Sequence, residues 1–242
     1  CSSDLIEDDF ALQLDGNDAV DLGEALLKQI GNWTVSTWVK PYEDLPLNYI
    51  YSEGSPEISF AIYLDDNREI HTSVFNRLEV GSNWIDATSP YGVISIGMWN
   101  YITITMEGAG IGQGTINFYV NGQYISSDTG QMCDPNGAGE YGMIGASTGA
   151  FNGASQDPHF FNGEIDEFRV WHRTLSEQEI LDGMYGGISP DDTQLQGYWK
   201  FDQTLNEISD YDGDGIQIQS TMIGDQDWVE GYSSPPQQPQ NP

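Results

Sequence analysis

The fold is decided by the stretches ALQLDGNDAVDLG (Ala11–Gly23) and FNGEIDEFRVWHRTLSEQEI (Phe161–Ile180). In the first stretch, Leu12 and Leu14 alternate with polar residues, which is the period of a β-strand with one buried face. A Gly-Asn-Asp turn follows at 16–18. We expect the next residues to return as a hairpin partner of this strand. The second stretch begins with a strand pattern and ends with the start of a helix.

The same alternation of apolar and polar residues recurs along the chain. It predicts further strands at Asn32–Pro41, Ile58–Leu64, Glu69–Phe75, Trp99–Met106, Thr115–Val120, Gln123–Ser126 and Tyr141–Ala146. Asn121-Gly122 between alternating apolar residues is a strong hairpin signal. The apolar stripe of Leu175–Tyr185 predicts one short helix, which Gly186 and Gly187 end. The pattern is that of an antiparallel, all-β domain.

Length and charge restrict the class of protein further. The chain has 242 residues, a length typical of one all-β sandwich with a single core. Its 38 acidic residues stand against 7 Lys and Arg, so the formal net charge is −31. Phosphate binding needs a basic surface, so nucleic acid is excluded as a partner. Divalent cations are the natural counter-ions of such a chain.

The order of three motifs carries a resemblance to a known family. GEIDEFRVW (163–171) is followed by LSEQEI (175–180) and then by GYWKFD (197–202). This order resembles that of laminin-G-like domains, which are concanavalin-A-like jelly rolls. The resemblance implies an antiparallel jelly-roll β-sandwich over residues 10–231, in which the last strands pack beside the first. The segment after Gln196 is too short for a second domain and is expected to close the same sandwich.

The two ends of the chain differ in composition from this domain. Residues 1–9 begin Cys-Ser-Ser-Asp and are acidic. They resemble the start of a mature bacterial lipoprotein, which implies a lipid on Cys1, a flexible tether and a position on the extracellular face of the outer membrane. The alternative is a disulfide between Cys1 and Cys133. Residues 232–242 are rich in Pro and Gln and predict a flexible tail. No run of 18 apolar residues occurs, so membrane contact is expected only through that lipid.

One motif invites an enzymatic interpretation. Glu164-Ile-Asp166 is similar to the start of the E-I-D-x-E signature of glucanases that share the jelly roll. A retaining glycosidase needs two carboxyl groups about 5 Å apart. Residues four apart lie on one face of a regular strand. The second glutamate would therefore stand at position 168, which is Phe168, while Glu167 would face the other way. We expect no hydrolase; the segment instead resembles its counterpart in laminin-G-like domains, which implies that Phe168, Val170 or Trp171 packs in the core.

Nucleophilic and zinc chemistry find little support in the sequence. The three histidines, His71, His159 and His172, are scattered. Cys133 has no evident histidine partner, and neither cysteine has the spacing of a zinc ligand. We expect each histidine to be an ordinary surface or core residue.

Calcium is the cofactor that the acidic turns favour, because hard cations take carboxylate and carbonyl oxygens. The resemblance to laminin-G-like domains makes Asp15, Asn17 and Asp166 candidate ligands of a structural Ca²⁺. A second candidate is the D-x-D-x-D-G sequence at Asp210, Asp212 and Asp214. The twelfth position of that loop is Thr221 rather than glutamate, which excludes a regulatory EF-hand.

A glycan site would need exposed aromatic rings that stack on sugar faces. The sequence places the candidates in loops, where sandwiches carry recognition. They are Trp84, Tyr91, Phe151 and Phe160, beside Tyr49 and Tyr51. The remaining tryptophans lie in predicted strands, and we expect core positions for Trp33, Trp38, Trp99, Trp171 and Trp199.

These observations lead to three hypotheses of different classes. The first is a non-enzymatic cell-surface lipoprotein whose calcium-stabilised jelly roll binds a surface glycan or acts in adhesion. The second is a protein-interaction subunit of an outer-membrane or cell-surface assembly. The third is a glycoside hydrolase.

Overall fold

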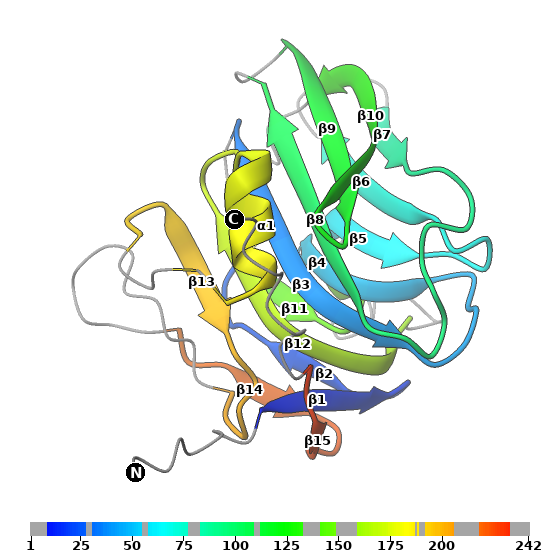
Figure 1. Cartoon of the computed structure of the whole chain (residues 1–242), viewed down its shortest axis with the longest axis vertical. Helices are drawn as coiled ribbons and strands as arrows, with labels where there is room; N and C mark the ends of the chain where they lie inside the picture. Colours follow the sequence, from blue (N-terminus) through cyan, green and yellow to red (C-terminus); the bar gives the residue numbers. More distant parts are fainter. Residues whose placement is uncertain are drawn as a thin grey trace, which may run out of the picture.

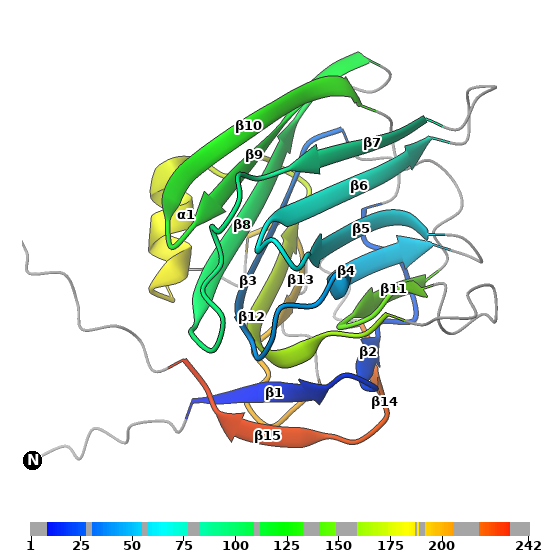
Figure 2. The same cartoon turned by 90° about the vertical axis from the view of Figure 1, so that its right-hand side faces the viewer.

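The computed structural model describes residues 9–27, 31–54, 58–76, 83–108, 112–132, 141–148, 159–186, 188, 192–205 and 218–232. These residues form two antiparallel sheets, packed face to face, and one helix (Figures 1 and 2). The predicted class, an all-β jelly-roll sandwich with one short helix, is confirmed. Within the described residues, no helix has the length and apolar character needed to cross a membrane.

The first sheet has eight strands in the order β10-β9-β8-β3-β12-β1-β15, and β13 also pairs with β12. Its strands are β1 (Phe10–Asp15), β3 (Trp33–Pro41), β8 (Asn100–Glu107), β9 (Gly112–Val120), β10 (Gln123–Met132), β12 (Asn162–Trp171), β13 (Leu195–Trp199) and β15 (Asp227–Glu230).

The second sheet has seven strands in the order β14-β2-β11-β4-β5-β6-β7. Its strands are β2 (Ala19–Asp21), β4 (Asn48–Gly54), β5 (Ile58–Leu64), β6 (Ile70–Asn76), β7 (Asn83–Thr88), β11 (Tyr141–Ile144) and β14 (Thr221–Ile223).

Two predicted hairpins have different outcomes in the structure. Asn121 and Gly122 both have positive φ angles, 52° and 74°, and they join β9 to β10 as the predicted hairpin. The expected hairpin of β1 with the following strand is wrong. β1 belongs to the eight-stranded sheet, whereas β2 pairs with β11 and β14 in the other sheet. The turn at 16–18 therefore carries the chain from one layer to the other.

The last strands lie beside the first, as the resemblance implies. β15 pairs with β1, and β13 pairs with β12. β1 and β13 both lie on the side of β12 that faces away from β3, one after the other along the strand. Strands β13, β14 and β15 thus complete the same sandwich (Figure 2).

The core lies between the two sheets and is built from large rings. Trp33 meets Phe60 edge-on, with ring centroids 5.2 Å apart. Phe168 packs between Tyr51 and Trp199, at 5.0 and 6.0 Å. The predicted burial of Trp33, Trp38, Trp171 and Trp199 is confirmed, while Trp99 is partly buried.

A bulge interrupts β12 at Glu167, whose φ is 52°. The pairing with β3 shifts between Asp166 and Arg169. Because of this extra residue, Ile165 and Phe168 both point into the core between the sheets. The expectation that positions 164 and 168 share a face is therefore wrong.

Part of the outer face of the eight-stranded sheet is covered by α1 (Glu177–Met184) (Figure 2). The helix starts at a capping box in which Ser176 and Glu179 satisfy each other's backbone N–H groups. Beneath it lies a second apolar cluster formed by Trp38, Tyr101, Tyr119, Trp171, Leu175, Ile180, Met184, Leu195 and Tyr198. The part of this face over β3, β8, β9, β12 and β13 is therefore occupied by packing, whereas no described helix covers the outer face of the seven-stranded sheet.

Candidate ligand and metal site on the seven-stranded sheet

A row of stacked rings crosses the outer face of the seven-stranded sheet. Strand alternation places Ile62 and Ile70 in the core and turns Tyr63 and His71 outward. The rings of Tyr63 and His71 are parallel within 4° at a centroid distance of 4.7 Å. Tyr49 stacks on Tyr63 at 5.2 Å and on His159 at 5.9 Å. We call these four residues (His159, Tyr49, Tyr63 and His71) the ring row.

Stacking hides the ring faces from solvent and leaves polar edges. The pKa of Tyr63 is raised by burial, partly offset by a hydrogen bond with Ser73. Burial raises the pKa of Tyr49 to about 12. Ser73 in turn donates to Asp86 at 2.5 Å. The row therefore presents protonated hydroxyls and a carboxylate rather than flat apolar faces.

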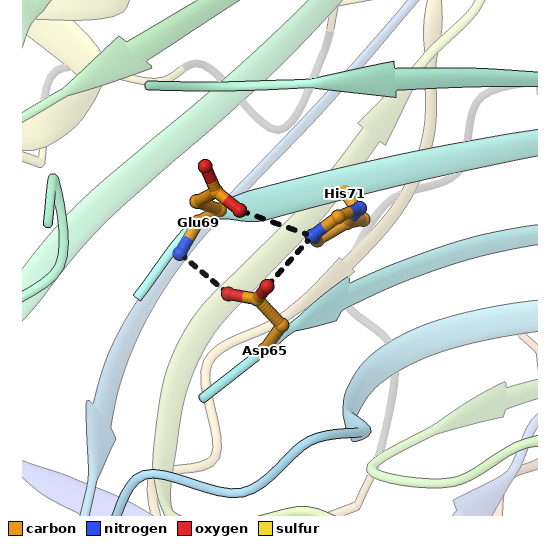
Figure 3. A group of neighbouring side chains, drawn as sticks. All are labelled: Asp65, Glu69 and His71. Atoms are coloured by element: carbon orange, nitrogen blue, oxygen red, sulfur yellow. Dashed lines mark hydrogen bonds and ion pairs between the residues drawn. The ribbon is translucent and has the colours of Figure 1, made fainter. Parts of the chain in front are cut away.

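At one end of the row, the turn between β5 and β6 brings two carboxylates to His71 (Figure 3). The Nε2 atom of His71 lies 3.3 Å from Oδ2 of Asp65 and 3.9 Å from Oε2 of Glu69. Oδ1 of Asp65 accepts from the backbone N–H groups of Asn67, at 3.0 Å, and Glu69, at 2.9 Å. We call Asp65, Glu69 and His71 the turn cluster.

The electrostatics of the turn cluster follow from these bonds. Burial raises the pKa of Asp65, but hydrogen bonds from the Glu69 N–H, His71 and Asn67 outweigh it and hold the pKa below its usual value. Asp65 is therefore a fixed anion. An aspartate that binds backbone N–H groups two and four residues onward is typical of tight turns.

Tyr91 adjoins this turn and is the most exposed of the large apolar or aromatic side chains described, at 76%. Its own turn is joined to the β5–β6 turn by two backbone bonds. Gly92 N–H donates to Asn67 O at 3.1 Å, and Ile94 N–H donates to Arg68 O at 3.4 Å. The turn that carries this exposed side chain is thus adjacent to the turn that holds the Asp65 carboxylate.

The structure does not place the other predicted ligand-binding aromatic residues beside Tyr91 and the β5–β6 turn. Phe160 is partly buried and forms a bridge with Ala146. Tyr51 belongs to the core. Trp84 lies in β7 opposite Phe75, but its side chain is outside the described residues, as is the whole of Phe151.

Most of the described cations are paired with carboxylates. Four form ion pairs: Lys40 with Glu164, Arg68 with Asp44, Arg169 with Glu167, and Arg173 with Glu179 and Asp192. The fifth, Lys200, lies close enough to Asp9 to lower the pKa of that carboxyl. Four of the five described cations are therefore already held by carboxylates.

The structure separates the predicted calcium ligands. Asp15 lies opposite Asn162 at one end of the β1–β12 pair. Asp166 is four residues further along β12, a distance of about 13 Å in a strand. Asn17 is exposed in the turn after Asp15. These residues do not form one site.

Asp15 instead meets Asp18 and Asp225. The carboxyl of Asp18 is 3% exposed and accepts from Asp15 N–H at 3.1 Å and Asp225 N–H at 2.8 Å. The pKa of Asp15 is raised by a hydrogen bond with the Asp18 carboxyl, by its charge and, further, by the charge of Asp225. A bound proton or cation would relieve the repulsion between these neighbouring carboxyl groups.

Asp166 lies in a second acidic group, with Asp9 and Asp202, on the face of β12 opposite to Ile165. It is fully buried, and its Oδ1 makes no hydrogen bond within the described residues. Burial raises its pKa well above the usual value, and the charges of Asp9 and Asp202 add to this. Burial, together with Asp202, also raises the pKa of Asp9 to about 6.

The remaining predicted sites lie outside the described residues. This holds for the acidic loop with Asp210, Asp212 and Asp214, and for both Cys1 and Cys133.

With this geometry in view, comparison with known proteins places the chain in a family. The profile described as the concanavalin A-like lectin/glucanases superfamily matches residues 14–181, more than half of the chain. The chain belongs to this superfamily.

Several proteins are similar to this chain in sequence or in fold. The chain is 25% identical over 156 residues to the pentraxin-related protein PTX3 of Mus musculus, covering 63% of this chain and 38% of that relative. The fold is similar to that of a putative carbohydrate binding protein from Bacteroides ovatus, with a TM-score of 0.63, 17% identity, and coverage of 93% of this chain and 60% of that one. The CBM40 of the Ruminococcus gnavus IT-sialidase, bound to α2,3-sialyllactose, has a TM-score of 0.56 and 14% identity, and covers 71% of this chain and 94% of that one.

The glucanase-like motif at residues 164–168 has a structural role in this protein. Glu164 accepts from Lys40 Nζ at 2.9 Å and from the Tyr42 hydroxyl at 2.7 Å. Because of the bulge at Glu167, Phe168 lies on the opposite face, inside the core. Position 168 therefore carries no carboxylate, and its side chain does not lie on the same face of the strand as Glu164.

Sequence reasoning missed the turn cluster, because it treated His71 as isolated. The signal was present as D-x-x-x-E-x-H (65–71), which straddles a hairpin turn. It also missed Asp225, which is 207 residues from Asp18 and has no sequence signal.

Proposed function

We propose that this domain binds a neutral glycan at Tyr91 and the turn cluster, on the outer edge of the seven-stranded sheet. The observation that carries the proposal is an aromatic side chain, 76% exposed, in a turn that is hydrogen-bonded to the turn in which backbone N–H groups hold the Asp65 carboxylate in place. A sugar presents an apolar face that can stack on an aromatic ring and hydroxyl groups that can donate to carboxylates. Tyr91 and Asp65 offer both kinds of contact.

Charge selects the class of glycan. The turn cluster contributes Asp65 and Glu69, and Asp86 lies further along the face. The nearest described cation, Arg68, is engaged with Asp44 at 3.0 Å. A sialylated ligand, such as the one bound by the CBM40, carries a carboxylate that these groups would repel. The site therefore favours uncharged sugars.

The relatives support binding rather than catalysis. The names of the Bacteroides ovatus and Ruminococcus gnavus proteins describe carbohydrate binding. Glu164 in this chain is engaged by Lys40 and Tyr42. A non-enzymatic binding domain is accordingly the function we propose.

Replacement of Tyr91 tests this site. Tyr91→Ala is expected to weaken binding of a neutral oligosaccharide, selected on a glycan array, by about 30-fold, because a well-placed aromatic contact is worth about 2 kcal/mol. Isothermal titration calorimetry measures the change.

Tyr124→Ala is the matched control for that experiment. Tyr124 is 51% exposed but lies on β10 of the other sheet, so its loss should leave affinity unchanged. Equal affinity of wild type and Tyr91→Ala would contradict the site. Binding of sialylated glycans alone would contradict the class of ligand.

We further propose that Ca²⁺ binds at the turn of Asp15, Asp18 and Asp225, where the neighbouring Asp18 and Asp225 raise the pKa of Asp15 and carboxylate oxygens are available to a hard cation. Such a cation would brace the turn that joins the two sheets. The buried group of Asp166, Asp9 and Asp202 is a second place where a cation would relieve repulsion.

Removal of calcium is expected to lower the melting temperature. Calcium at about 100-fold over its dissociation constant adds about 2.7 kcal/mol per site, which corresponds to about 5–10 °C for a domain of this size. Differential scanning calorimetry with calcium and with excess chelator measures the difference. Asp15→Asn should reduce this difference, whereas Asp44→Asn, at an exposed ion pair, should not. Superimposable melting curves with calcium and with chelator would contradict the proposal that this domain binds Ca²⁺.

Display on the cell surface through a lipid on Cys1 remains a prediction from the sequence. The same holds for the alternative of a protein-interaction subunit in an outer-membrane assembly. Intact mass and co-purifying proteins after gentle detergent extraction test both.

A further inference from the structure

The turn cluster has the donor set of a transition-metal site. Asp65, Glu69 and His71 each offer one ligand atom, and these atoms lie within 4.8 Å of one another. Two oxygens and one imidazole nitrogen suit zinc-class ions, whereas calcium prefers six to eight oxygens. All three side chains are partly buried, with exposed side-chain fractions between 12% and 22%.

The spacing of the donors is close to that of tetrahedral coordination. Zinc binds nitrogen and carboxylate oxygen at about 2.0–2.2 Å, so two ligands of one ion are about 3.3–3.6 Å apart. Nε2 of His71 is 3.3 Å from Oδ2 of Asp65 and 3.9 Å from Oε2 of Glu69, and all three ligand atoms lie within 4.8 Å of one another. Figure 3 shows both carboxylates facing the His71 imidazole.

The imidazole of His71 faces both carboxylates through one nitrogen. Nε2 lies 3.3 Å from Oδ2 of Asp65 and 3.9 Å from Oε2 of Glu69. One buried nitrogen is thus directed at two carboxylate oxygens, which is the arrangement of donors around a bound cation.

The surrounding groups orient the ligands as a metal site requires. Nδ1 of His71 is 3.2 Å from the Thr88 hydroxyl, and the imidazole stacks on Tyr63. Metal-binding histidines usually engage their second nitrogen in this way. The Asn67 side chain donates to Oδ2 of Asp65 at 3.0 Å, while two backbone N–H groups hold Oδ1.

We infer that Asp65, Glu69 and His71 bind a divalent transition-metal ion of the zinc class, with a fourth position open to water. The inference does not rest on glycan binding, and it concerns a site separate from the Asp15–Asp18 turn. The competing account is a cluster without metal, in which His71 only contacts the two carboxylates.

The test is metal binding by the full chain with Cys1 and Cys133 replaced by serine, so that thiols cannot act as ligands. Zn²⁺ is titrated calorimetrically in a large excess of Mg²⁺, which occupies non-specific carboxylates. Co²⁺ is added in parallel, because its visible absorption reports tetrahedral geometry. The expected result is one zinc equivalent and visible cobalt bands.

Variants link that result to the cluster. His71→Gln should lower zinc affinity by about 100-fold or more and abolish the cobalt bands, and Thr88→Ala should lower affinity by about 10-fold. His159→Gln, at the other end of the ring row, is the matched control and should bind like the parent. Glu69→Gln, at the most exposed of the three positions, provides a second test if His71→Gln unfolds.

Two results would overturn the inference. One is the absence of zinc binding above the magnesium background, which would leave the ion-pair account. The other is zinc binding that persists unchanged in both His71→Gln and Glu69→Gln.

Discussion

Phe168→Glu is expected to unfold the domain rather than to create a hydrolase. The variant restores the E-x-D-x-E spacing in sequence, but the side chain at 168 is fully buried between Tyr51 and Trp199. Loss of a buried phenylalanine costs about 3–5 kcal/mol. Burial of an unpaired carboxylate adds a further penalty. The sum approaches the whole stability of a typical domain, about 5–15 kcal/mol.

Circular dichroism and thermal melting measure this effect. Phe168→Leu is the control and should cost only about 1–2 kcal/mol, because it keeps an apolar side chain in the same cavity. A folded Phe168→Glu protein with nearly unchanged melting, or one that hydrolyses glucans, would contradict the position of the bulge at Glu167.

Glu53→Ala is expected to destabilise the protein by about 3 kcal/mol or more, since each buried partner left without a hydrogen bond costs about 1–3 kcal/mol. Glu53 is 1% exposed. Its Oε1 accepts from Leu26 N–H at 2.8 Å, from Leu27 N–H at 2.9 Å and from the Tyr51 hydroxyl. It therefore fixes the segment before β3 onto β4.

Chemical denaturation gives this free energy directly. Glu53→Gln retains an acceptor oxygen at the same position, and we expect it to lose less than half as much stability. A cost below 1 kcal/mol for Glu53→Ala would show that water replaces the carboxylate, and hence that the 24–27 segment is not held as described.

Much of the fold was predictable because its signals are local. Alternation in the sequence at 33–41 predicts β3, Asn121-Gly122 predicts the β9–β10 hairpin, and the stripe at 175–185 predicts α1. Each depends on periodicity or turn chemistry within about ten residues.

The errors come from features that only tertiary structure determines. The turn after Asp15 was expected to close a hairpin, but β2 finds better partners in β11 and β14 of the opposite sheet. The bulge at Glu167 reverses the face of every later residue in β12, and one positive φ angle leaves no clear mark in the sequence.

The candidate site was only partly predictable for the same reason. Exposure of Tyr91 follows from its place in a Ser-Pro-Tyr-Gly turn. The ring row instead depends on strand register, which sets Tyr49 against Tyr63 and Tyr63 against His71. Glu53 lies in a polar stretch that resembles a solvent-exposed turn, and only the fold shows that it is buried.

The central claim is that the outer edge of the seven-stranded sheet binds sugar, while the helix-covered face of the other sheet is structural. Chemical-shift mapping of the isotope-labelled protein with a neutral oligosaccharide tests this most directly. The account predicts that perturbed amides gather at 63–71 and 88–92, around Tyr91 and the turn cluster. Perturbations confined to α1 and strands β8 to β10 would contradict it.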